Sequence, residues 1–180
     1  MARIQKPPPG KLVVSIIYSS MDALAECVSN LEKKFGRVMS ETLEIECEQA
    51  GKYSEEMGDN LVRRFYAFET DIPRSALPQI KSICHKLEPN FSDTVDGYHF
   101  RTVNLDPGIL TPSALVMTSH KEAGHKIYLK DGVYAEVAMI HAHGGFCRLP
   151  WTESDFCDDE AIQFFEEVRN AFDILESVEA

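Results

Sequence analysis

The residues with the clearest potential for chemistry are Asp106, His125 and Glu136, all in the second half of the chain. A carboxylate and an imidazole can exchange a proton with a substrate that lies within hydrogen-bond reach of both, so these three residues are candidate catalytic groups. The same three side chains would also make an acceptable mixed ligand set for a divalent metal such as manganese, iron or zinc. Their spacing matches no established motif, and whether the chain is an enzyme stays open at this stage.

Asp106 belongs to the stretch Asn104-Leu105-Asp106-Pro107-Gly108, which stands where an expected strand ends. Asn104 and Asp106 are two residues apart, so on a strand they point to the same face. An amide and a carboxylate at such a position can bind a cation, orient a water or hold a sugar hydroxyl. The competing interpretation is an Asp-Pro-Gly turn in which the asparagine only caps the local backbone.

His125 and Glu136 flank an expected β-hairpin with Asp131-Gly132 at its turn, because an Asp-Gly pair accepts the positive φ values of a type I′ turn. Tyr128 lies on the first arm, and Tyr134 shares one face of the second arm with Glu136. We expect both tyrosines to line a ligand pocket beside the glutamate. The competing interpretation is that Glu136 lies in solvent on an edge strand or forms a structural ion pair.

Three further residues are candidates for ligand binding. Arg63 and Arg64 are neighbours on an expected strand, so their guanidinium groups point to opposite faces and one of them could bind a phosphate or carboxylate. Trp151 is the only tryptophan of the chain. It either lines the pocket or anchors the core.

The elements that must position these residues begin with four strands and two helices. Apolar and alternating runs predict strands at 12–18, 41–48, 61–69 and 98–105. Helix-start residues at Ser20 and Ser75 precede apolar residues at helical spacing, and 49–59 reads as an irregular polar link. The order βαββαβ is the ferredoxin-like pattern, in which two helices cover a single face of an antiparallel sheet.

The second half extends this unit. Strands are expected at 114–119, 125–129, 132–140 and 146–149, and a C-terminal helix follows them. No linker rich in Gly, Ser or Pro separates the halves, so the sequence predicts a single α+β domain over residues 11–180. A stiff proline-rich arm, residues 1–10, precedes it.

Composition narrows the classes of function. The chain has 180 residues and a net charge of −11, which disfavours nucleic acid as a partner because that needs a basic surface. No apolar run approaches the roughly 20 residues of a membrane span, and the N-terminus lacks the pattern of a secretory signal. Five cysteines without a paired spacing favour reduced thiols. We therefore expect a cytoplasmic protein without a membrane partner.

Several stretches together resemble a known family. The sequences at 103–108 (VNLDPG), 125–129 (HKIYL) and 132–137 (GVYAEV) follow one another in the order typical of the uncharacterised bacterial family catalogued as domain of unknown function four-four-one-six. The similarity covers nearly the whole chain. That family has no established activity, so the resemblance implies a shared polar site without naming its reaction.

The sequence thus predicts a pocket between the Asn104–Gly108 stretch and the hairpin. A small molecule would bind or react there, either an anionic metabolite or a ligand that acts with a divalent metal, and the identity of that ligand or cofactor stays unknown. The alternative is a non-enzymatic interaction module that acts through a sheet face or as a homodimer.

Overall fold

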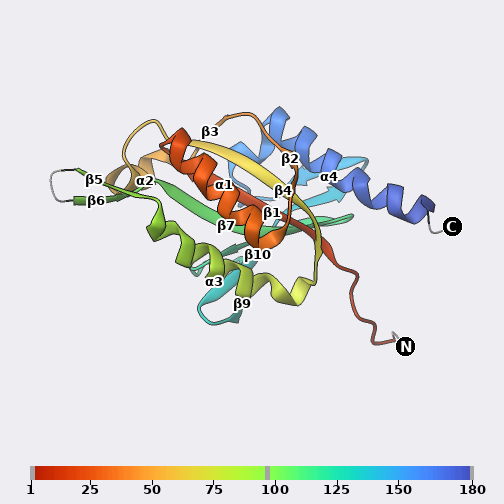
Figure 1. Ribbon diagram of the computed structural model, residues 1–180. Coiled ribbons are helices and arrows are strands. Elements are labelled where there is room, and N and C mark those ends of the chain that lie inside the picture. The colour runs from red at the N-terminus through yellow and green to blue at the C-terminus, as the bar shows by residue number, and fades with distance from the viewer. Residues whose placement is uncertain (1–2, 96–97, 179–180) are drawn as a thin grey trace.

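The computed structural model of the protein describes residues 3–95 and 98–178, and it has an α+β fold (Figure 1). The strands are β1 (Gly10–Tyr18), β2 (Val38–Glu41), β3 (Ile45–Glu46), β4 (Val62–Ile72), β5 (Ser92–Val95), β6 (Tyr98–Arg101), β7 (Val103–Thr111), β8 (Ala114–Ser119), β9 (Ile127–Lys130), β10 (Val133–Ala142) and β11 (Gly145–Arg148). The helices are α1 (Met21–Phe35), α2 (Ala50–Met57), α3 (Leu77–Leu87) and α4 (Asp159–Val178). Short 3-10 turns are η1 (Arg74–Ala76), η2 (Glu88–Asn90) and η3 (Ser154–Cys157).

One large sheet organises the described chain. Its strand order is β11-β10-β8-β7-β1-β4-β2, with β3 also paired to β4 and β9 also paired to β10. All of these pairs are antiparallel. Strands β5 and β6 form a separate two-stranded ladder. Among the described residues no helix is long and apolar enough to cross a bilayer.

Strand β1 is the centre of the fold. It pairs with β4 on one side and β7 on the other, and all of its residues are buried. Its apolar, largely β-branched run suits a strand that is covered on both faces. Because successive side chains point to opposite faces, Leu12, Val14 and Ile16 enter one apolar cluster while Val13 enters another.

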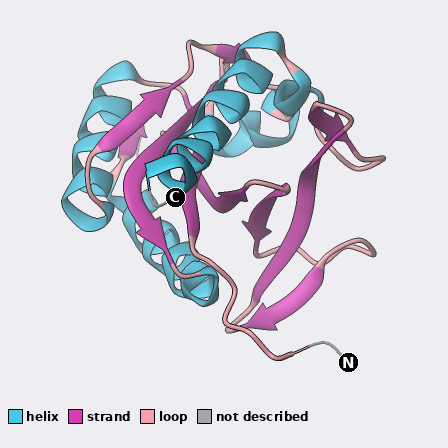
Figure 2. Ribbon diagram, turned by 90° about the vertical axis from the view of Figure 1, so that its right-hand side faces the viewer, coloured by secondary structure: helices cyan, strands magenta, loops and turns pink. Residues whose placement is uncertain are grey.

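Helices α1 and α3 cover the first face of the sheet, and Figure 2 shows helices on both sides of the strands. Helix α1 begins after Ser20, whose hydroxyl accepts the N–H of Ala23 at 3.4 Å. It ends at Gly36, whose φ of 95° lies in the region that favours glycine. The buried stripe of this helix, with Leu24 and Leu31, packs on the residues of β1 that face it.

Helices α2 and α4 lie on the second face. Helix α4 packs Phe165 and Val168 against Val13 and Phe65, and the two phenylalanine rings meet edge to face at 5.1 Å. Helix α2 brings Met57 into a separate small cluster. Between these two apolar regions the sheet carries polar and charged side chains, which line a cavity.

Strands β7 and β8 are joined at one end and separate at the other. Their pairing runs from Thr111↔Ala114 to Gly108↔Met117 and stops there. A Cβ on Gly108 would lie 2.3 Å from the Met117 sulfur and 2.6 Å from a backbone oxygen of β8, so this close approach requires glycine. Beyond it, the carbonyl of Pro107 accepts the hydroxyl of Thr118, so the missing N–H of this proline faces the side where the strands part.

The Asn104–Gly108 stretch is therefore not a turn. The turn interpretation is wrong because these residues continue β7, in antiparallel register with β1 from Val103 to Leu110. The predicted strand at 98–105 is in fact two strands, since β6 pairs with β5 and only β7 joins the large sheet.

Two other elements also differ from prediction. Residues 49–59 contain α2 and are not an irregular link. The strand predicted at 41–48 is broken between β2 and β3, and Leu43 in the break is 69% exposed while Ile45 and Cys47 are buried. The N–H of Leu43 binds Glu160 on α4 at 2.9 Å, so a tertiary contact replaces the expected strand pairing.

The hairpin turn is confirmed. Asp131 and Gly132 have φ values of 53° and 73°, as a type I′ turn requires. Strands β9 and β10 pair across it, with Tyr128 opposite Tyr134.

Candidate functional site

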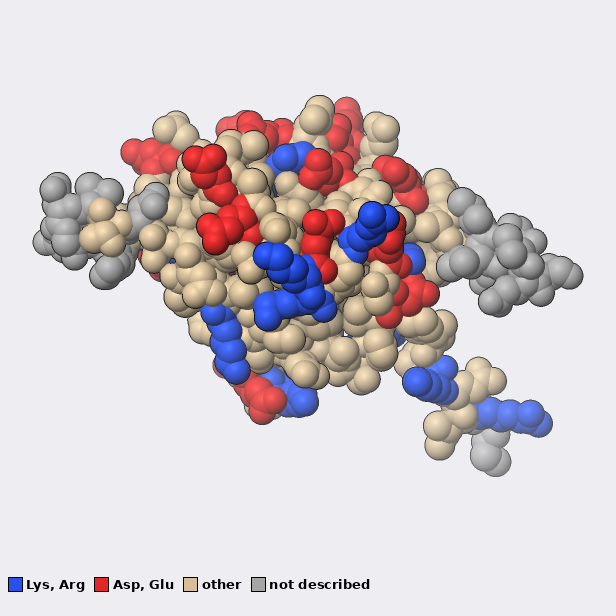
Figure 3. Space-filling view, in the orientation of Figure 1, with Lys and Arg blue, Asp and Glu red and all other residues tan. Residues whose placement is uncertain are grey.

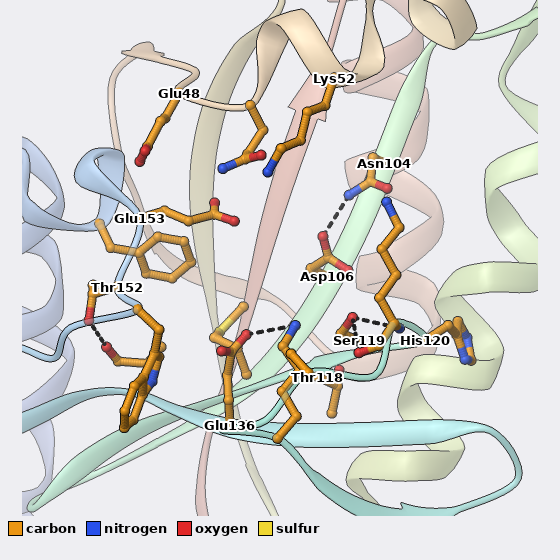
Figure 4. A pocket seen from close by; sticks show the side chains of 18 of the residues that line it. Glu48, Lys52, Asn104, Asp106, Thr118, Ser119, His120, Glu136, Thr152 and Glu153 are labelled. Carbon is orange, nitrogen blue, oxygen red and sulfur yellow. Dashed lines mark hydrogen bonds and ion pairs between the residues drawn. The ribbon is translucent and has the colours of Figure 1, made fainter.

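An open cavity of about 610 Å³ lies on the second face of the sheet. Its floor comes from β7, β8 and β10, and its walls come from α2, β4, β6 and β11, from the loop between β8 and β9, and from the segment that links β11 to α4. Side chains of α3 and η2, on the other face of the sheet, also reach it. In Figure 4 the side chains of Lys52, Asp106, Glu136 and Glu153 surround its centre. The volume is within the range of about 300–1,000 Å³ that small-molecule sites occupy.

Asp106 lies on the floor, where β7 and β8 part. One carboxylate oxygen accepts Lys81 Nζ at 2.7 Å, and the other accepts the amide of Asn104 at 2.7 Å. Lys81 comes from α3 on the opposite face of the sheet and also donates to the carbonyl of Leu105 at 2.9 Å. Nearby, Glu88 accepts the N–H of Leu105 at 2.8 Å. The two side chains take the place of a neighbouring strand, which keeps the gap open without leaving this backbone unpaired.

The ionised form of Asp106 is the stable one. Burial by itself would raise the pKa of this carboxyl, but the ammonium of Lys81, the amide of Asn104 and the charge of Arg63 hold the pKa below its usual value. The side chain is still 30% exposed. Asp106 is therefore a fixed carboxylate that a molecule in the cavity can reach.

His125 and Glu136 form a hydrogen-bonded pair on the other side of the floor. His125 Nε2 lies 2.7 Å from one carboxylate oxygen of Glu136, and Lys126 Nζ lies 3.1 Å from the other. A neutral imidazole that donates from Nε2 keeps Nδ1 as its proton acceptor. The ring of His125 stacks on the indole of Trp151, with centroids 5.0 Å apart and planes 10° apart, and the indole N–H donates to the carbonyl of Val137. The histidine is thus held by a carboxylate at its edge and by an aromatic ring on its face.

Arg63 is the buried cation of the cavity wall. Its guanidinium contacts Glu153 at 2.7 Å and Asp155 at 2.8 Å. Because two carboxylates share one guanidinium, neither is fully compensated. Burial, with a smaller contribution from Glu153, raises the pKa of the Asp155 carboxyl to about 6 against the opposing effect of Arg63. Arg63 is thus already paired, and it stabilises the wall more than it offers a free charge to a ligand.

Tyr53 of α2 also faces this charged region. Burial, together with the charges of Asp106 and Glu153, raises the pKa of its hydroxyl to about 12, although Arg63 opposes the shift. Lys121 from the loop between β8 and β9 lies over its ring, with Nζ 5.3 Å from the centroid. This contact joins α2 to the loop across the cavity.

Charged side chains are concentrated in the cavity. Among the residues that the structure describes, seven of its lining residues are basic: Lys52, Arg63, Lys81, Arg101, Lys121, Lys126 and Arg148. Seven are acidic: Glu48, Glu56, Glu88, Asp106, Glu122, Glu136 and Glu153. The lining formed by described residues therefore has no net charge. Because the chain has 18 basic and 29 acidic residues, the other 11 basic and 22 acidic residues account for the whole net charge of −11.

The basic side chains of the cavity are not all used by the fold. Four of them pair with carboxylates, whereas Lys52, Lys121 and Arg148 have no salt-bridge partner within the described part of the chain. Six of the seven carboxylates already have an ion pair or a hydrogen bond, and Glu122 is the exception among described residues. Within the described lining, cations without an ion pair therefore outnumber carboxylates without a polar partner, although the lining as a whole is neutral.

The structure brings together six of the nine residues that we selected from the sequence. Arg63, Asn104, Asp106, His125, Glu136 and Trp151 all line the cavity. Arg64, Tyr128 and Tyr134 are not among the lining residues. Arg64 points to the opposite face of β4, where it donates to the carbonyl of Thr42 at 2.6 Å and pairs with Glu41. The two tyrosines meet edge to face at 5.3 Å near the hairpin turn, beyond the cavity.

The proposed metal set of Asp106, His125 and Glu136 is not formed. Within residues 3–95 and 98–178, no group of three or more His, Cys, Asp and Glu side chains is arranged to hold a metal ion. The two carboxylates have other partners. Asp106 is bound by Lys81 and Asn104, and Glu136 is bound by His125 and Lys126.

Sequence reasoning missed the residues that come from helices and loops. Lys52 and Tyr53 lie on α2, Lys81 on α3, Lys121 in the loop after β8, and Glu153 just before η3. One signal was available: Lys81 falls among the apolar positions of α3, with Pro78 and Cys84 on the same buried stripe. A lysine at a buried helical position needs a carboxylate partner.

The comparisons with known proteins give a family without an activity. No curated protein and no solved structure matches the chain. A family model described as Domain of unknown function (DUF4416) matches residues 8–172 of the 180. That match includes every element from β1 to most of α4 and every residue of the cavity described above. The chain therefore belongs to the DUF4416 family.

Proposed function

We propose that the protein binds a small anionic metabolite in the cavity. The observation that supports this most is the charge distribution: the described lining is neutral in a chain of net charge −11, and within the described residues its cations Lys52, Lys121 and Arg148 have no ion-pair partner. Unpaired cations around a concave site attract anions and lower their free energy there. An anion that entered the cavity would gain these contacts without breaking an existing ion pair.

His125 with Glu136 is the proposed acid–base pair of this site. The carboxylate of Glu136 accepts the proton on Nε2 of His125 and so fixes the tautomer of the imidazole. A carboxylate partner has the same effect on many histidines that act as general bases. Asp106 is the proposed second polar group, and it stays ionised because Lys81 and Asn104 hold it. Binding is the part of this proposal that the charge distribution supports directly, and proton transfer requires the bound molecule to reach Nδ1 of His125.

Calorimetry with simple anions tests the binding proposal. Inorganic phosphate, citrate and glucose 6-phosphate would be titrated into the whole protein, and thermal unfolding would be followed in parallel. At about 100 times its dissociation constant, a ligand adds about 2.7 kcal/mol to the free energy of unfolding. Lys52→Gln and Lys121→Gln should each weaken binding. Lys33→Gln changes an exposed lysine of α1 away from the cavity and should leave binding unchanged.

A flat titration with all three anions would refute the proposal. Equal weakening by Lys33→Gln and Lys121→Gln would also contradict it, since the effect would then come from net charge and not from the cavity.

A second candidate function, self-association, has its own observation. Nine large hydrophobic side chains of the described chain are exposed, and six of them lie on β9, on β10 or at Trp151. Ile127 is 70% exposed on β9, which is an edge strand. An apolar edge strand is a surface onto which another strand can pair. Light scattering at several concentrations, compared with Ile127→Lys, would detect a dimer, and a strict monomer would rule it out.

We also propose that the first half has a ferredoxin-like arrangement. The order β7-β1-β4-β2, antiparallel throughout, supports this, as does the position of α1 and α3 on one face. The nine-stranded sheet goes beyond that unit, because β8 to β11 extend it past β7.

A cytoplasmic location remains our proposal. All five cysteines are free, and Cys27, Cys47 and Cys84 are buried. Free thiols are typical of reducing compartments.

A further inference from the structure

We infer that the anion of this cavity is a phosphorylated sugar or polyol, an inference that rests on the proposed function. The cavity offers two kinds of recognition at once. Carboxylates that are already neutralised by a lysine stand on its floor, and cations that have no carboxylate partner among the described residues stand at its rim. The first kind suits hydroxyl groups, and the second suits a phosphate.

Toward a ligand, the carboxylates of Asp106 and Glu136 on the floor act mainly as hydrogen-bond acceptors, because a lysine already balances the charge of each. An ionised carboxylate has about four acceptor positions. Lys81 and Asn104 take two on Asp106, and His125 and Lys126 take two on Glu136. The adjacent lysine cancels the charge that would attract a bare cation, but the remaining lone pairs can still accept a hydroxyl. Both side chains are reachable, with 30% and 18% of their surface exposed.

Each of these carboxylates is held in place before a ligand arrives. Moving Asp106 or Glu136 would break two charge-assisted hydrogen bonds, so the acceptors are rigid. Rigid acceptors select ligands by the positions of their donors. A flexible, exposed carboxylate would not discriminate in this way.

The strand register separates the two acceptors. Glu136 of β10 stands opposite Met117 of β8, and Met117 stands opposite Gly108 of β7, which is two residues from Asp106. The two carboxylates therefore rise from the same face of the sheet, two strands apart. Two strand spacings amount to about 10 Å, and Asp106 lies two residues beyond the last β7–β8 pair, where the strands have parted. The strand positions of the two residues are therefore more than about 10 Å apart, so the two carboxylates contact different parts of one ligand. A molecule with several hydroxyls along its length satisfies both.

The rim provides the anionic subsite. Lys52 on α2, Lys121 in the loop after β8 and Arg148 on β11 are exposed and line the cavity. Figure 4 shows Lys52 reaching toward the space above Asp106. A phosphate monoester carries close to two negative charges and three acceptor oxygens, which match several separate cations better than a single carboxylate does.

Calorimetry on the whole protein tests this inference with probes that differ in one feature. The hydroxylated phosphates are glycerol 3-phosphate, ribose 5-phosphate and glucose 6-phosphate, and the comparison ligands are inorganic phosphate, gluconate and glucose. At least one hydroxylated phosphate should bind at least tenfold more tightly than inorganic phosphate and than gluconate. Glucose without a phosphate should bind most weakly.

Variants then assign the subsites. Glu136→Gln should raise the dissociation constant of the best hydroxylated phosphate about tenfold, the effect of one hydrogen bond to a charged group. It should not raise that of inorganic phosphate, because the change removes no cation and frees Lys126 from its ion pair. Asp106→Asn is a second variant with the same expected pattern, in case the first fails to fold. Lys121→Gln should weaken both ligands, and Lys33→Gln should weaken neither.

The outcomes separate this inference from the proposed function. If no anion binds, both fail. If inorganic phosphate, citrate or gluconate binds as tightly as every hydroxylated phosphate, the cavity still binds anions and only the sugar-phosphate inference is overturned. Equal losses for phosphate and sugar phosphate in Glu136→Gln would overturn the role given to the floor carboxylates.

Discussion

At the scale of single residues, the ion pair between Lys81 and Asp106 keeps both side chains charged. Lys81 crosses from α3 to the cavity floor, where it binds both Asp106 and the carbonyl of Leu105. The side chain is 5% exposed. Burial alone would lower the pKa of this lysine, but Asp106 raises it above its usual value. Lys81 therefore remains charged in the interior and keeps the carboxylate ionised.

Replacing Lys81 by alanine should be strongly destabilising. The change leaves the Asp106 carboxylate without its cation, with only the amide of Asn104 as a donor, and leaves the carbonyl of Leu105 without the donor Lys81. Breaking a buried pair in this way costs about 3–5 kcal/mol. Because Asp106 can still be hydrated through the cavity, we expect a loss of about 3 kcal/mol in the free energy of unfolding. Urea unfolding followed by circular dichroism measures it. Lys33→Ala, on the exposed side of α1, should change the value by less than about 0.5 kcal/mol, and a similar small effect of Lys81→Ala would contradict the assignment.

Asp155 should make stability depend on pH. Its carboxyl titrates at a pKa of about 6 in the folded protein and at about 3.9 in an unfolded chain. The folded state therefore binds more protons between these values, so this residue stabilises the fold below pH of about 4 and loses that contribution as the pH rises through about 6. Asp155→Asn removes the titration.

The measurement compares the free energies of unfolding at pH 5 and pH 7. The free energy of unfolding of Asp155→Asn minus that of the wild type should be larger at pH 7 than at pH 5. Asp59→Asn changes an exposed aspartate and serves as the control. If the difference between wild type and Asp155→Asn has the same size at both values, Asp155 does not titrate in this range.

At the scale of elements, the parting of β7 and β8 creates the site. Going back along β7 from its turn with β8, Gly108 is the last residue in close contact with β8. The next residue in that direction, Pro107, has no N–H that would need an acceptor on a neighbouring strand. Side chains of α3 and η2 then complete the hydrogen bonds of Leu105. The gap exposes Asp106 while the backbone of Leu105 beside it stays hydrogen-bonded.

Gly108→Ala tests this junction. A Cβ there would meet a backbone oxygen as well as the sulfur of Met117, and a backbone group cannot rotate away. We expect a loss of about 1–3 kcal/mol, the usual cost of overpacking, measured by thermal or urea unfolding. Gly124→Ala is the matched control, since a Cβ at Gly124 has no neighbour within 4 Å. A neutral Gly108→Ala would show that the strands can shift without cost.

At the scale of the whole molecule, two apolar regions share one strand. The cluster beneath α1 and α3 contains Val14, and the cluster beneath α4 contains Val13, its neighbour on β1. If β1 unfolded, both apolar regions would therefore lose buried side chains at the same time. Charge has a different distribution: Figure 3 shows acidic and basic side chains interspersed on the face that carries α1 and α3, while the cavity lies on the other face.

The shared strand predicts a single unfolding transition. Trp151, the only tryptophan, reports the cavity side by fluorescence, and far-UV circular dichroism reports all helices and strands. The two urea curves should coincide. Val13→Ala and Val14→Ala should each move both curves together. Separate midpoints for the two probes would show that the faces unfold independently.

The sequence by itself determined many of the local elements and selected six residues that line the cavity. Apolar runs and spacing located β1, α1, α3 and the hairpin, because period and turn chemistry are properties of neighbouring residues. Alternation on strands also placed Asn104 and Asp106 on one face, and both line the cavity. The same reasoning failed for 41–48, where a contact to α4 breaks the strand.

Only the tertiary structure decided which charges meet. Partners for Glu136 could be proposed from residue type, but the partner of Asp106 could not, because Lys81 lies 25 residues from it on the far side of the sheet. The Asn104–Gly108 stretch could be a turn or a strand until β1 paired with it along its length. Whether β8 continues beside it or parts from it depends on contacts between strands and helices, which no local pattern encodes. The chemistry of the cavity is set by that parting, because it admits Lys81 to the floor and leaves Asp106 open to a ligand.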